Sequence, residues 1–204
     1  MFTGIVQGTA PVVEIIKKER FQTHVIELTP ELIQGLQIGA SVAHNGCCLT
    51  VTKIESNRVW FDLMQETLDK TNLGLLTEGC SVNIERAAKF GDEIGGHSMS
   101  GHISNVATIC DLVKMETNCT VWFELPNLEM AKYVLAKGYI GIDGCSLTIG
   151  EVQQHRFNVH LIPETLNRTL FGEREVGDKV NIEVDPQTQA IVDTVERVLA
   201  QRGV

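Results

Sequence analysis

Short runs of alternating apolar and polar residues cover the first half of the chain, and turn-forming residues separate them. Strands with this pattern bury one face and expose the other. Five segments have the β-branched or alternating character that predicts a strand: residues 12–16, 23–28, 49–54, 59–63 and 81–85. Strands at this spacing are typical of a small antiparallel barrel.

Two short helical signals interrupt the strands. Thr29 followed by Pro30 is typical of a helix cap with proline in the first turn. Residues 128–137 predict a second helix, with Lys137 in its last turn and Gly138 ending it.

A longer helix is predicted at the C-terminal end. Asp185 and Pro186 look like its cap and its first residue. Apolar side chains then recur with the spacing i, i+4, i+7 and i+8, at Ile191, Val195, Val198 and Leu199. This apolar stripe either packs on the chain's own barrel or joins subunits, and the sequence favours neither.

The chain contains an internal repeat, which is the strongest inference from the residues alone. Residues 46–85 placed on residues 144–183, an offset of 98 without a gap, share 16 identities in 40 positions. Chance pairing gives roughly two or three. Nearer the N-terminus the offset is 97. The repeat therefore predicts two homologous barrels, residues 1–96 (with a glycine-rich linker at the end) and 97–186, before a helix at 187–204.

The composition limits the classes of partner. Hydrophobic residues make up 43% of the 204 residues and charged residues 21%, which suits a packed core. The 17 Lys and Arg against 26 Asp and Glu leave a net charge of −9 without a basic block. Neither nucleic acid nor an anionic membrane is therefore an expected partner. Likewise, no apolar run approaches the roughly 20 residues that span a bilayer.

The cysteines and the first residues bear on the compartment and on cofactors. There is no basic leader, so no secretory signal is expected. The six cysteines show no CxxC pair and are expected to be free thiols in a reducing compartment, with the cytoplasm as the predicted location. No nucleotide-binding glycine motif is present. His97 and His102 lack the partners of a zinc site, so no metal is predicted.

The two halves differ at matched positions that could carry chemistry. Cys48 corresponds to Ser146, and His102 corresponds to Ile5. Two related barrels suggest two related pockets, and unequal side chains suit a protein that treats two copies of one ligand differently. Structural explanations stay open: Cys48 as a small buried side chain, His102 as an ordinary imidazole, and the duplication as a device for stability alone.

Several motifs in order resemble the riboflavin synthase family, the α-chain type. They are residues 1–6 (MFTGIV), 45–51 (NGCCLTV), the glycines and histidines of 95–102, residues 141–148 (GIDGCSLT) and residues 186–190 (PQTQA). The resemblance covers essentially the whole chain. It implies an all-β fold of two tandem homologous six-stranded Greek-key β-barrels, with a C-terminal α-helix that assembles a homotrimer.

The resemblance also implies a transferase of riboflavin biosynthesis that acts on two molecules of 6,7-dimethyl-8-ribityllumazine per active site. A four-carbon unit moves from one to the other and gives riboflavin and 5-amino-6-ribitylamino-uracil, without a cofactor. The active site is expected between the N-terminal barrel of one subunit and the C-terminal barrel of its neighbour, and lumazine synthase is a candidate partner. The alternatives are a lumazine protein, which binds without turnover, and a duplicated barrel that binds no lumazine.

The family's site residues carry over onto segments that open each half and onto the shared Gly-x-x-Leu-Thr and Glu-Thr-Leu segments. For the first lumazine the resemblance implies Gly4, Ile5, Val6, Cys48, Leu49, Thr50, Asp62, Leu63, Met64, Gln65, Glu66 and Thr67. For the second it implies Gly101, His102, Ile103, Lys137, Ser146, Leu147, Thr148, Ile162, Pro163, Glu164, Thr165, Leu166 and Asn167.

The resemblance also suggests which side chains carry the chemistry. His102 is expected to transfer a proton, and Cys48 is expected to act as a nucleophile or a polar contact. Four further residues are expected to support them: Phe2, Ser41, Thr148 and Asp185.

Overall fold

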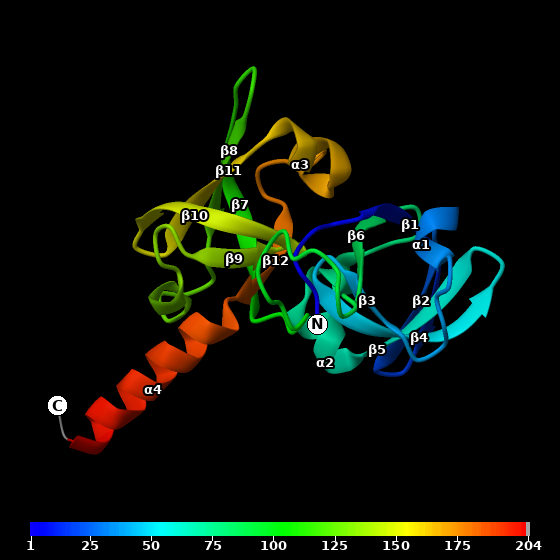
Figure 1. Cartoon of the computed structure of the whole chain (residues 1–204), viewed down its shortest axis with the longest axis horizontal. Helices are drawn as coiled ribbons and strands as arrows, with labels where there is room; N and C mark the ends of the chain where they lie inside the picture. Colours follow the sequence, from blue (N-terminus) through cyan, green and yellow to red (C-terminus); the bar gives the residue numbers. More distant parts are fainter. Residues whose placement is uncertain (203–204) are drawn as a thin grey trace.

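The computed structural model describes residues 1–202 as two β-barrels and a C-terminal helix (Figure 1). The first barrel is closed in the order β1-β2-β5-β4-β3-β6, with every pair antiparallel. Its strands are β1 (Gly8–Lys18), β2 (Phe21–Glu27), β3 (Ser41–His44), β4 (Cys47–Glu55), β5 (Arg58–Met64) and β6 (Ser81–Arg86). The successive strands β3, β4 and β5 are neighbours, and β6 returns beside β3, which is a Greek key.

The second barrel repeats this topology and is also closed. Its strands are β7 (Asn105–Lys114), β8 (Cys119–Glu124), β9 (Tyr139–Ile142), β10 (Cys145–Gln153), β11 (Arg156–Leu161) and β12 (Lys179–Val184). The expected pair of Greek-key barrels is thus confirmed. Closure leaves no unpaired sheet edge.

Helices are short except at the C-terminal end. The α-helices are α1 (Pro30–Ile33), α2 (Gln65–Lys70), α3 (Pro163–Arg168) and α4 (Pro186–Arg202), and three 3₁₀ turns are η1 (Asn72–Leu75), η2 (Met130–Tyr133) and η3 (Leu170–Gly172). Thr29 caps α1 by accepting a hydrogen bond from the Leu32 nitrogen, as its position before Pro30 predicts. In residues 1–202, the helices are all too short or too polar to cross a membrane.

All five strands that alternation predicts are present, within a residue or a few of the expected bounds. The strand β3 does not show in the pattern, because its last three residues are all buried and do not alternate. Fully buried strands lack the period of two on which such a prediction depends.

The predicted helix at 128–137 is wrong. The structure has only the 3₁₀ turn η2 there, and Val134 is extended and buried in the core of the second barrel. Lys137 has a left-handed φ of 67°. Its nitrogen donates to the Ile149 carbonyl at 2.9 Å, so it leads into β9 and does not close a helix. Packing of one apolar residue into the barrel overrides the local helical preference.

The residues that open each half pack against the other half. Val6 lies in the apolar core of the second barrel, and Ile103 packs on the core of the first. Between the barrels, the Phe2 nitrogen donates to the Met99 carbonyl at 2.8 Å, and the Met99 nitrogen donates back at 3.0 Å. The N-terminus therefore lies between the two barrels (Figure 1). We call residues 2–6 and 99–103 the exchanged segments.

Two tight turns meet at the junction of the barrels. The β3–β4 hairpin turns at Asn45 and Gly46, and the β9–β10 hairpin turns at Asp143 and Gly144, all four with positive φ. Asn-Gly and Asp-Gly are the pairs that a two-residue type I′ turn favours. A Cβ on Gly46 would lie 2.7 Å from the Gly144 nitrogen. Glycine is therefore needed there for the backbone conformation and for the close approach.

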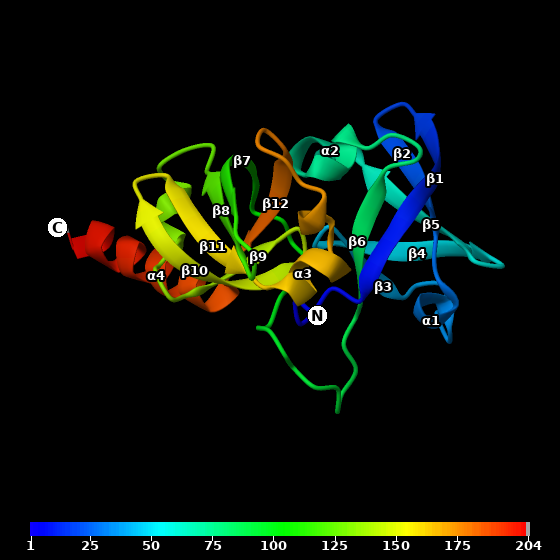
Figure 2. The same cartoon turned by 90° about the horizontal axis from the view of Figure 1, so that it is seen from above.

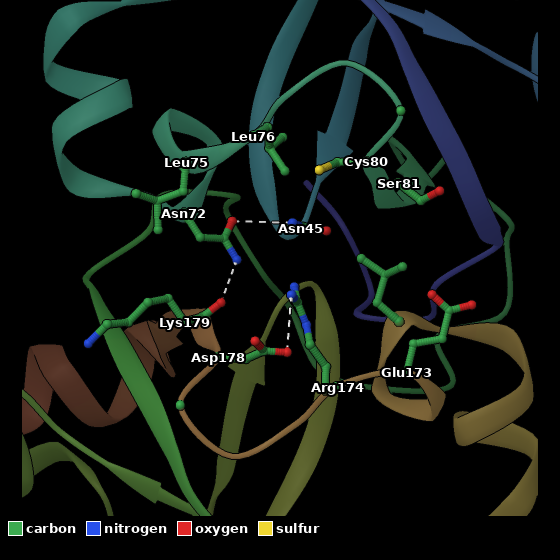
Figure 3. A pocket seen from close by; sticks show the side chains of 13 residues that line it. Asn45, Asn72, Leu75, Leu76, Cys80, Ser81, Glu173, Arg174, Asp178 and Lys179 are labelled. Carbon is green, nitrogen blue, oxygen red and sulfur yellow. Dashed lines mark hydrogen bonds and ion pairs between the residues drawn. The ribbon is translucent and has the colours of Figure 1, made fainter.

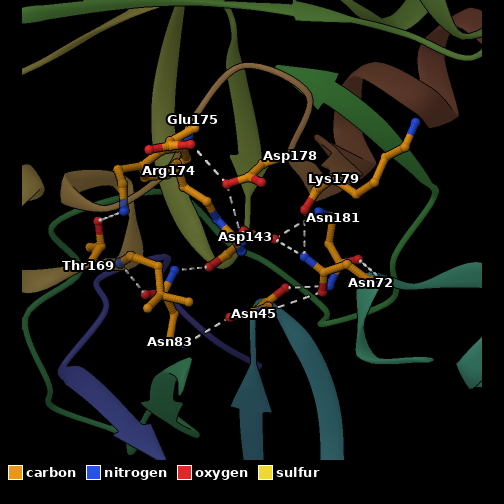
Figure 4. A network of polar contacts seen from close by, with 12 residues as sticks. Asn45, Asn72, Asn83, Asp143, Thr169, Arg174, Glu175, Asp178, Lys179 and Asn181 are labelled. Atoms are coloured by element: carbon orange, nitrogen blue, oxygen red, sulfur yellow. Dashed lines mark hydrogen bonds and ion pairs between the residues drawn. The ribbon is translucent and has the colours of Figure 1, made fainter. Parts of the chain in front are cut away.

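Buried polar side chains connect these turns across the junction (Figure 4). The Asn83 amide donates to the Asp143 carbonyl at 2.8 Å, and the matched Asn181 amide donates to the Asn45 carbonyl at 2.9 Å. The Arg174 guanidinium donates to the Asp143 carboxylate at 2.6 Å. Burial raises the pKa of Asp143, and the charge of Arg174 opposes that shift. The barrels are thus joined by specific hydrogen bonds as well as by apolar contact.

The helix α4 extends away from the second barrel (Figures 1 and 2). Lys132 donates to Glu196 at 2.6 Å, and the Tyr133 hydroxyl donates to Asp193, so polar contacts tether its side to η2. The apolar stripe is exposed at all four positions: Ile191, Val195, Val198 and Leu199. The stripe therefore does not pack on the chain's own barrel.

Two buried histidines are neutral in the first barrel. The His44 ring lies 4.2 Å from the Phe61 ring, and burial lowers the pKa of His44 to about 3. Burial, with the nearby Lys17 charge, lowers the pKa of His24 to about 4. An unfolded histidine titrates near 6.5. Unfolding therefore takes up protons below that pH, and the stability due to the neutral rings is complete above it and is lost as the pH falls toward the folded pKa.

We expect the free energy of unfolding to fall by about 2 kcal/mol per buried histidine between pH 7 and pH 5. In His44→Leu this pH dependence should be weaker by about that amount, because one titrating group is gone. His160→Leu, at an exposed ring on β11, should keep the full dependence. Urea unfolding at both pH values measures the difference, and equal slopes in all three proteins would contradict it.

Candidate functional site

A pocket of about 230 Å³ opens on the second barrel where three segments meet. One wall is the exchanged segment with Gly4 and Ile5, a second is the start of β10 with Ser146 and Leu147, and a third is the turn into α3 at Ile162. Apolar surface with a few polar groups at its edge is the usual lining of a small-molecule site. This pocket is the strongest candidate for a ligand site within the chain.

The exchanged segment is held tightly against this pocket. The Gly4 carbonyl accepts a hydrogen bond from the Ser146 nitrogen at 2.8 Å. Gly4 has a φ of 76°, and a Cβ there would lie 2.5 Å from the Ser146 Cβ. Both the left-handed conformation and the contact therefore require glycine.

The matched place on the first barrel has the same construction. The Gly101 carbonyl accepts from the Cys48 nitrogen at 2.9 Å, and a Cβ on Gly101 would lie 2.5 Å from the Cys48 Cβ. The next residue, His102, is exposed, and Cys48 is half-buried. The structure thus brings the segment of His102 to the strand of Cys48, the two residues expected to carry the chemistry.

The expected division into two ligand sets needs one correction. The resemblance groups residues 4–6 with Cys48, and residues 101–103 with Ser146. The structure places residues 4–6 beside Ser146 and residues 101–103 beside Cys48. The exchanged segments cross between the barrels, and a sequence repeat matches segments without showing on which barrel they pack.

His97 contacts Ser146, which lines the pocket on the second barrel, and it is absent from the expected site residues. Its Nδ1 lies 2.7 Å from the Ser146 hydroxyl, and its ring stacks on Tyr139 with centroids 5.2 Å apart. Burial lowers the pKa of His97, although the charge of Asp185 opposes the shift. The imidazole is therefore available as a neutral hydrogen-bond partner of Ser146. The sequence signal was its place directly after Gly95 and Gly96, within a family motif.

The Glu-Thr-Leu segments form the first turns of α2 and α3. Glu66 pairs with Lys70 at 2.8 Å, and Glu164 pairs with Arg168, each four residues on. The hydrogen bond from Lys70 lowers the pKa of Glu66. Arg168 also lines the second pocket, although the carried-over set ends at Asn167. The presence of a basic residue at both matched positions, Lys70 and Arg168, is the sequence feature that could have indicated Arg168.

The residues just before these helices differ in whether their side chains are exposed or point into the barrel core. Met64 and Ile162 are exposed, by 69% and 61%, and Ile162 lines the pocket on the second barrel. Leu63 is fully buried in the first core, so its side chain does not face a pocket. Asp62 is exposed and accepts from the Thr23 hydroxyl at 2.7 Å. Only alternate residues of a strand can reach a ligand on one face.

The residues expected to support catalysis are dispersed within one chain. Phe2 is buried between the barrels, and Ser41 is half-buried at the start of β3, opposite Thr50. Thr148 is exposed on β10. Asp185 caps α4 by accepting from the Thr188 nitrogen at 2.9 Å and hydroxyl at 2.7 Å. Burial raises the pKa of Asp185, but those hydrogen bonds outweigh burial, and the pKa is lowered.

The chain also has a larger cavity, about 520 Å³, between the barrels (Figure 3). Several of its polar side chains already have partners, although the Arg174 Nε is buried without one in the described part of the chain. Arg174 bonds Asp143, and Asn72 donates to the Lys179 carbonyl at 3.1 Å and to Asp143 at 2.9 Å. This cavity belongs to the polar junction. Elsewhere in residues 1–202, no cluster of three His, Cys, Asp or Glu side chains is placed to hold a metal ion.

Comparison with known proteins identifies the repeated unit. A family model for the lumazine binding domain matches residues 3–87 and again residues 100–185. Riboflavin synthase of Escherichia coli (strain K12) is 62% identical over 202 residues, which are 99% of this chain and 95% of that protein. These matches confirm the resemblance drawn from the motifs and the presence of a repeat.

Solved structures share the fold. LumP complexed with riboflavin has a TM-score of 0.85 and 30% identity, covering 91% of this chain and 100% of that one. LumP complexed with 6,7-dimethyl-8-(1'-D-ribityl) lumazine has a TM-score of 0.83 and 29% identity, covering 91% and 99%. Proteins with this pair of barrels thus include ones solved with a lumazine or a flavin.

Proposed function

The chain belongs to the riboflavin synthase family, and we propose that it makes riboflavin from two molecules of 6,7-dimethyl-8-ribityllumazine. Identity of 62% to the Escherichia coli riboflavin synthase over 99% of the chain carries this conclusion. The chain is accordingly an enzyme, a transferase. On this proposal one lumazine gives up a four-carbon unit and leaves as 5-amino-6-ribitylamino-uracil, and the other gains the unit and becomes riboflavin.

The pocket on the second barrel and the matched place at Cys48 on the first barrel give this reaction its two binding places. Each lumazine lies against one barrel, with an exchanged segment on one side and the turn into α2 or α3 on another. Holding two reactants in the reactive arrangement can lower a barrier by up to about 7–11 kcal/mol. Alignment of the two rings is therefore the main contribution that we assign to the barrels, and no cofactor is required.

Proton transfer falls to the side chains that differ between the pockets. One lumazine must lose a proton from its 7-methyl group, and its electron-poor ring stabilises the resulting anion. His102, which follows the Gly101 that is bonded to Cys48, is the proposed proton acceptor, and Cys48 is the proposed nucleophile or polar contact. The matched pocket has Ile5 and Ser146 at those positions, with His97 bonded to Ser146. The two lumazines are thus held by different groups, as unequal roles require.

We propose that the chain works as a homotrimer in which α4 joins the subunits. The exposed stripe on α4 supports this, because an amphipathic helix without a partner in its own chain is typically covered by another subunit. The matched places at Cys48 and at Ser146 also lie on separate barrels of one chain. The N-terminal barrel of one subunit and the C-terminal barrel of its neighbour would then face each other and complete one site with two lumazines.

Val195→Glu is expected to convert the trimer to a monomer and to remove most of the turnover, because a charge in the middle of the stripe opposes its burial. Arg197→Glu, on another face of the same helix, is the matched control and should remain trimeric. Light scattering gives the mass of each variant. A trimeric Val195→Glu would contradict the assignment of the stripe.

The function itself is tested by mixing the purified chain with 6,7-dimethyl-8-ribityllumazine, without added cofactor, and following riboflavin absorbance. We expect one riboflavin for every two lumazines consumed. Tight binding without riboflavin would favour the second candidate, a lumazine-binding protein without turnover; similarity to LumP, at 30% identity, gives that candidate its support. No binding would leave only the duplicated barrel.

We place the enzyme in the cytoplasm. All six cysteines are free thiols, which suits a reducing compartment. Lumazine synthase, which by its product is the natural supplier of the substrate, is the partner that we propose outside the trimer.

A further inference from the structure

A buried carboxylate holds each exchanged segment. Glu85 on β6 is only 3% exposed and accepts from the Thr3 nitrogen at 2.7 Å, the Thr3 hydroxyl at 2.9 Å and the Gly4 nitrogen at 3.0 Å. Within residues 1–202 it forms no ion pair with a lysine or arginine. Its charge is therefore stabilised mainly by hydrogen-bond donors of the exchanged segment.

The matched residue of the second half does the same. Glu183 on β12 is 2% exposed and accepts from the Ser100 nitrogen at 2.6 Å, the Ser100 hydroxyl at 2.8 Å and the Gly101 nitrogen at 3.1 Å. The two carboxylates thus hold equivalent residues of the two exchanged segments. Burial raises the pKa of both Glu85 and Glu183, and these hydrogen bonds oppose the shift.

Each carboxylate acts on the pocket of the other barrel. Glu183 belongs to the second barrel, and the Gly101 that it holds accepts from the Cys48 nitrogen on the first. Glu85 belongs to the first barrel, and the Gly4 that it holds accepts from the Ser146 nitrogen on the second. A chain of two hydrogen bonds therefore leads from each carboxylate to the pocket across the junction.

We propose that Glu85 and Glu183 are positioning residues, each of which fixes the backbone wall of the lumazine pocket on the opposite barrel. Their role in the reaction rests on the proposed function, whereas the contacts from each carboxylate to the segment on the opposite barrel do not. Charge-assisted bonds to a buried carboxylate are stronger than neutral ones. They hold the segment of His102 against Cys48 and the segment of Ile5 against Ser146, as an aligned pair of rings requires.

Alkylation of Cys48 in the full-length protein tests whether Glu183 holds the segment that covers Cys48 on the opposite barrel. The measurement does not depend on turnover. Glu183→Gln weakens the bonds to Ser100 and Gly101, so the segment that covers Cys48 should open more often. We expect iodoacetamide to modify Cys48 about tenfold faster in this variant, measured by mass spectrometry of the peptide. Glu85→Gln is the matched control, because it loosens the other segment and should leave the Cys48 rate unchanged. Cys110, on β7, serves as a reference thiol in each sample.

Turnover then reports on the positioning role. The kcat of both variants should be about tenfold lower than that of the unchanged protein. Urea unfolding should show that the two variants lose comparable stability. Equal acceleration of Cys48 alkylation in the two variants would show a general loosening and overturn the proposal, and so would no acceleration in either. If Glu183→Gln does not fold, Ser100→Ala removes one of the same hydrogen bonds with a smaller change, and Thr3→Ala is its counterpart. The protein could also show no turnover while Cys48 alkylation is faster in Glu183→Gln and unchanged in Glu85→Gln. That result would support the contacts across the junction and contradict only the proposed function.

Discussion

Replacement of His102 by glutamine is expected to lower kcat about 10²–10⁴-fold, the usual contribution of a general acid or base. Glutamine keeps a polar side chain at the exposed position that follows Gly101 but does not take up a proton near neutral pH. Binding of the lumazine should change little, since glutamine keeps a hydrogen-bonding side chain at this position. The measurement is the initial rate of riboflavin formation at saturating substrate, together with the dissociation constant from lumazine fluorescence.

His155→Gln is the control for this experiment. His155 lies at the β10–β11 turn, 3.0 Å from Glu124 and away from the pockets, so its variant should turn over normally. Cys48→Ala extends the test to the second proposed residue. If His102→Gln kept full turnover, the proton would have to go elsewhere, and His97 beside Ser146 would become the first candidate.

Gly46→Ala is expected to destabilise the protein by about 2–5 kcal/mol. A residue with a side chain costs about 1–2 kcal/mol in the left-handed conformation, and overpacking adds about 1–3 kcal/mol. The added Cβ would lie 2.7 Å from the Gly144 nitrogen and 3.0 Å from its Cα, in the facing turn. Backbone atoms cannot rotate away as a flexible side chain can. The two turns, and with them the two barrels, must therefore separate.

Gly79→Ala separates the two causes. Gly79 also has a left-handed φ, 92°, but a Cβ there would meet nothing within 4 Å. This variant should lose only the conformational part, about 1–2 kcal/mol. Urea unfolding of both variants gives the comparison. Equal losses at positions 46 and 79 would mean that the junction yields to an added methyl group without cost.

Much of the fold could be predicted from the sequence because the chain contains an internal repeat. Sixteen identities in 40 matched positions make the two halves alike, and alternation shows most strands of one half. The two-residue turns at Asn45–Gly46 and Asp143–Gly144 were not predicted, although their residue types are the ones that positive φ at both positions favours. Errors arose where packing outweighs local pattern: the fully buried β3, and residues 128–137, where Val134 enters the core.

The candidate site was only partly accessible. Motifs found Cys48, His102 and Ser146, and the resemblance supplied the segments around them. His97 was considered only as a zinc ligand, because its partner, the Ser146 hydroxyl, is 49 residues away in the sequence and comes near only in the folded chain. Leu63, by contrast, was included as part of a continuous range, although the strand turns it into the core.

The sequence by itself determined the repeat, the pair of barrels, the family and the kinds of side chain at the two pockets. These follow from local preferences and from residue identity, which the linear order contains. Only the tertiary structure decided that the segments opening the halves exchange barrels, that Glu85 and Glu183 hold them there, and that the stripe of α4 lies open. Each of these depends on which surfaces meet. Two halves with nearly the same local pattern are equally consistent with either pairing until the packing of Val6 and Ile103 selects one.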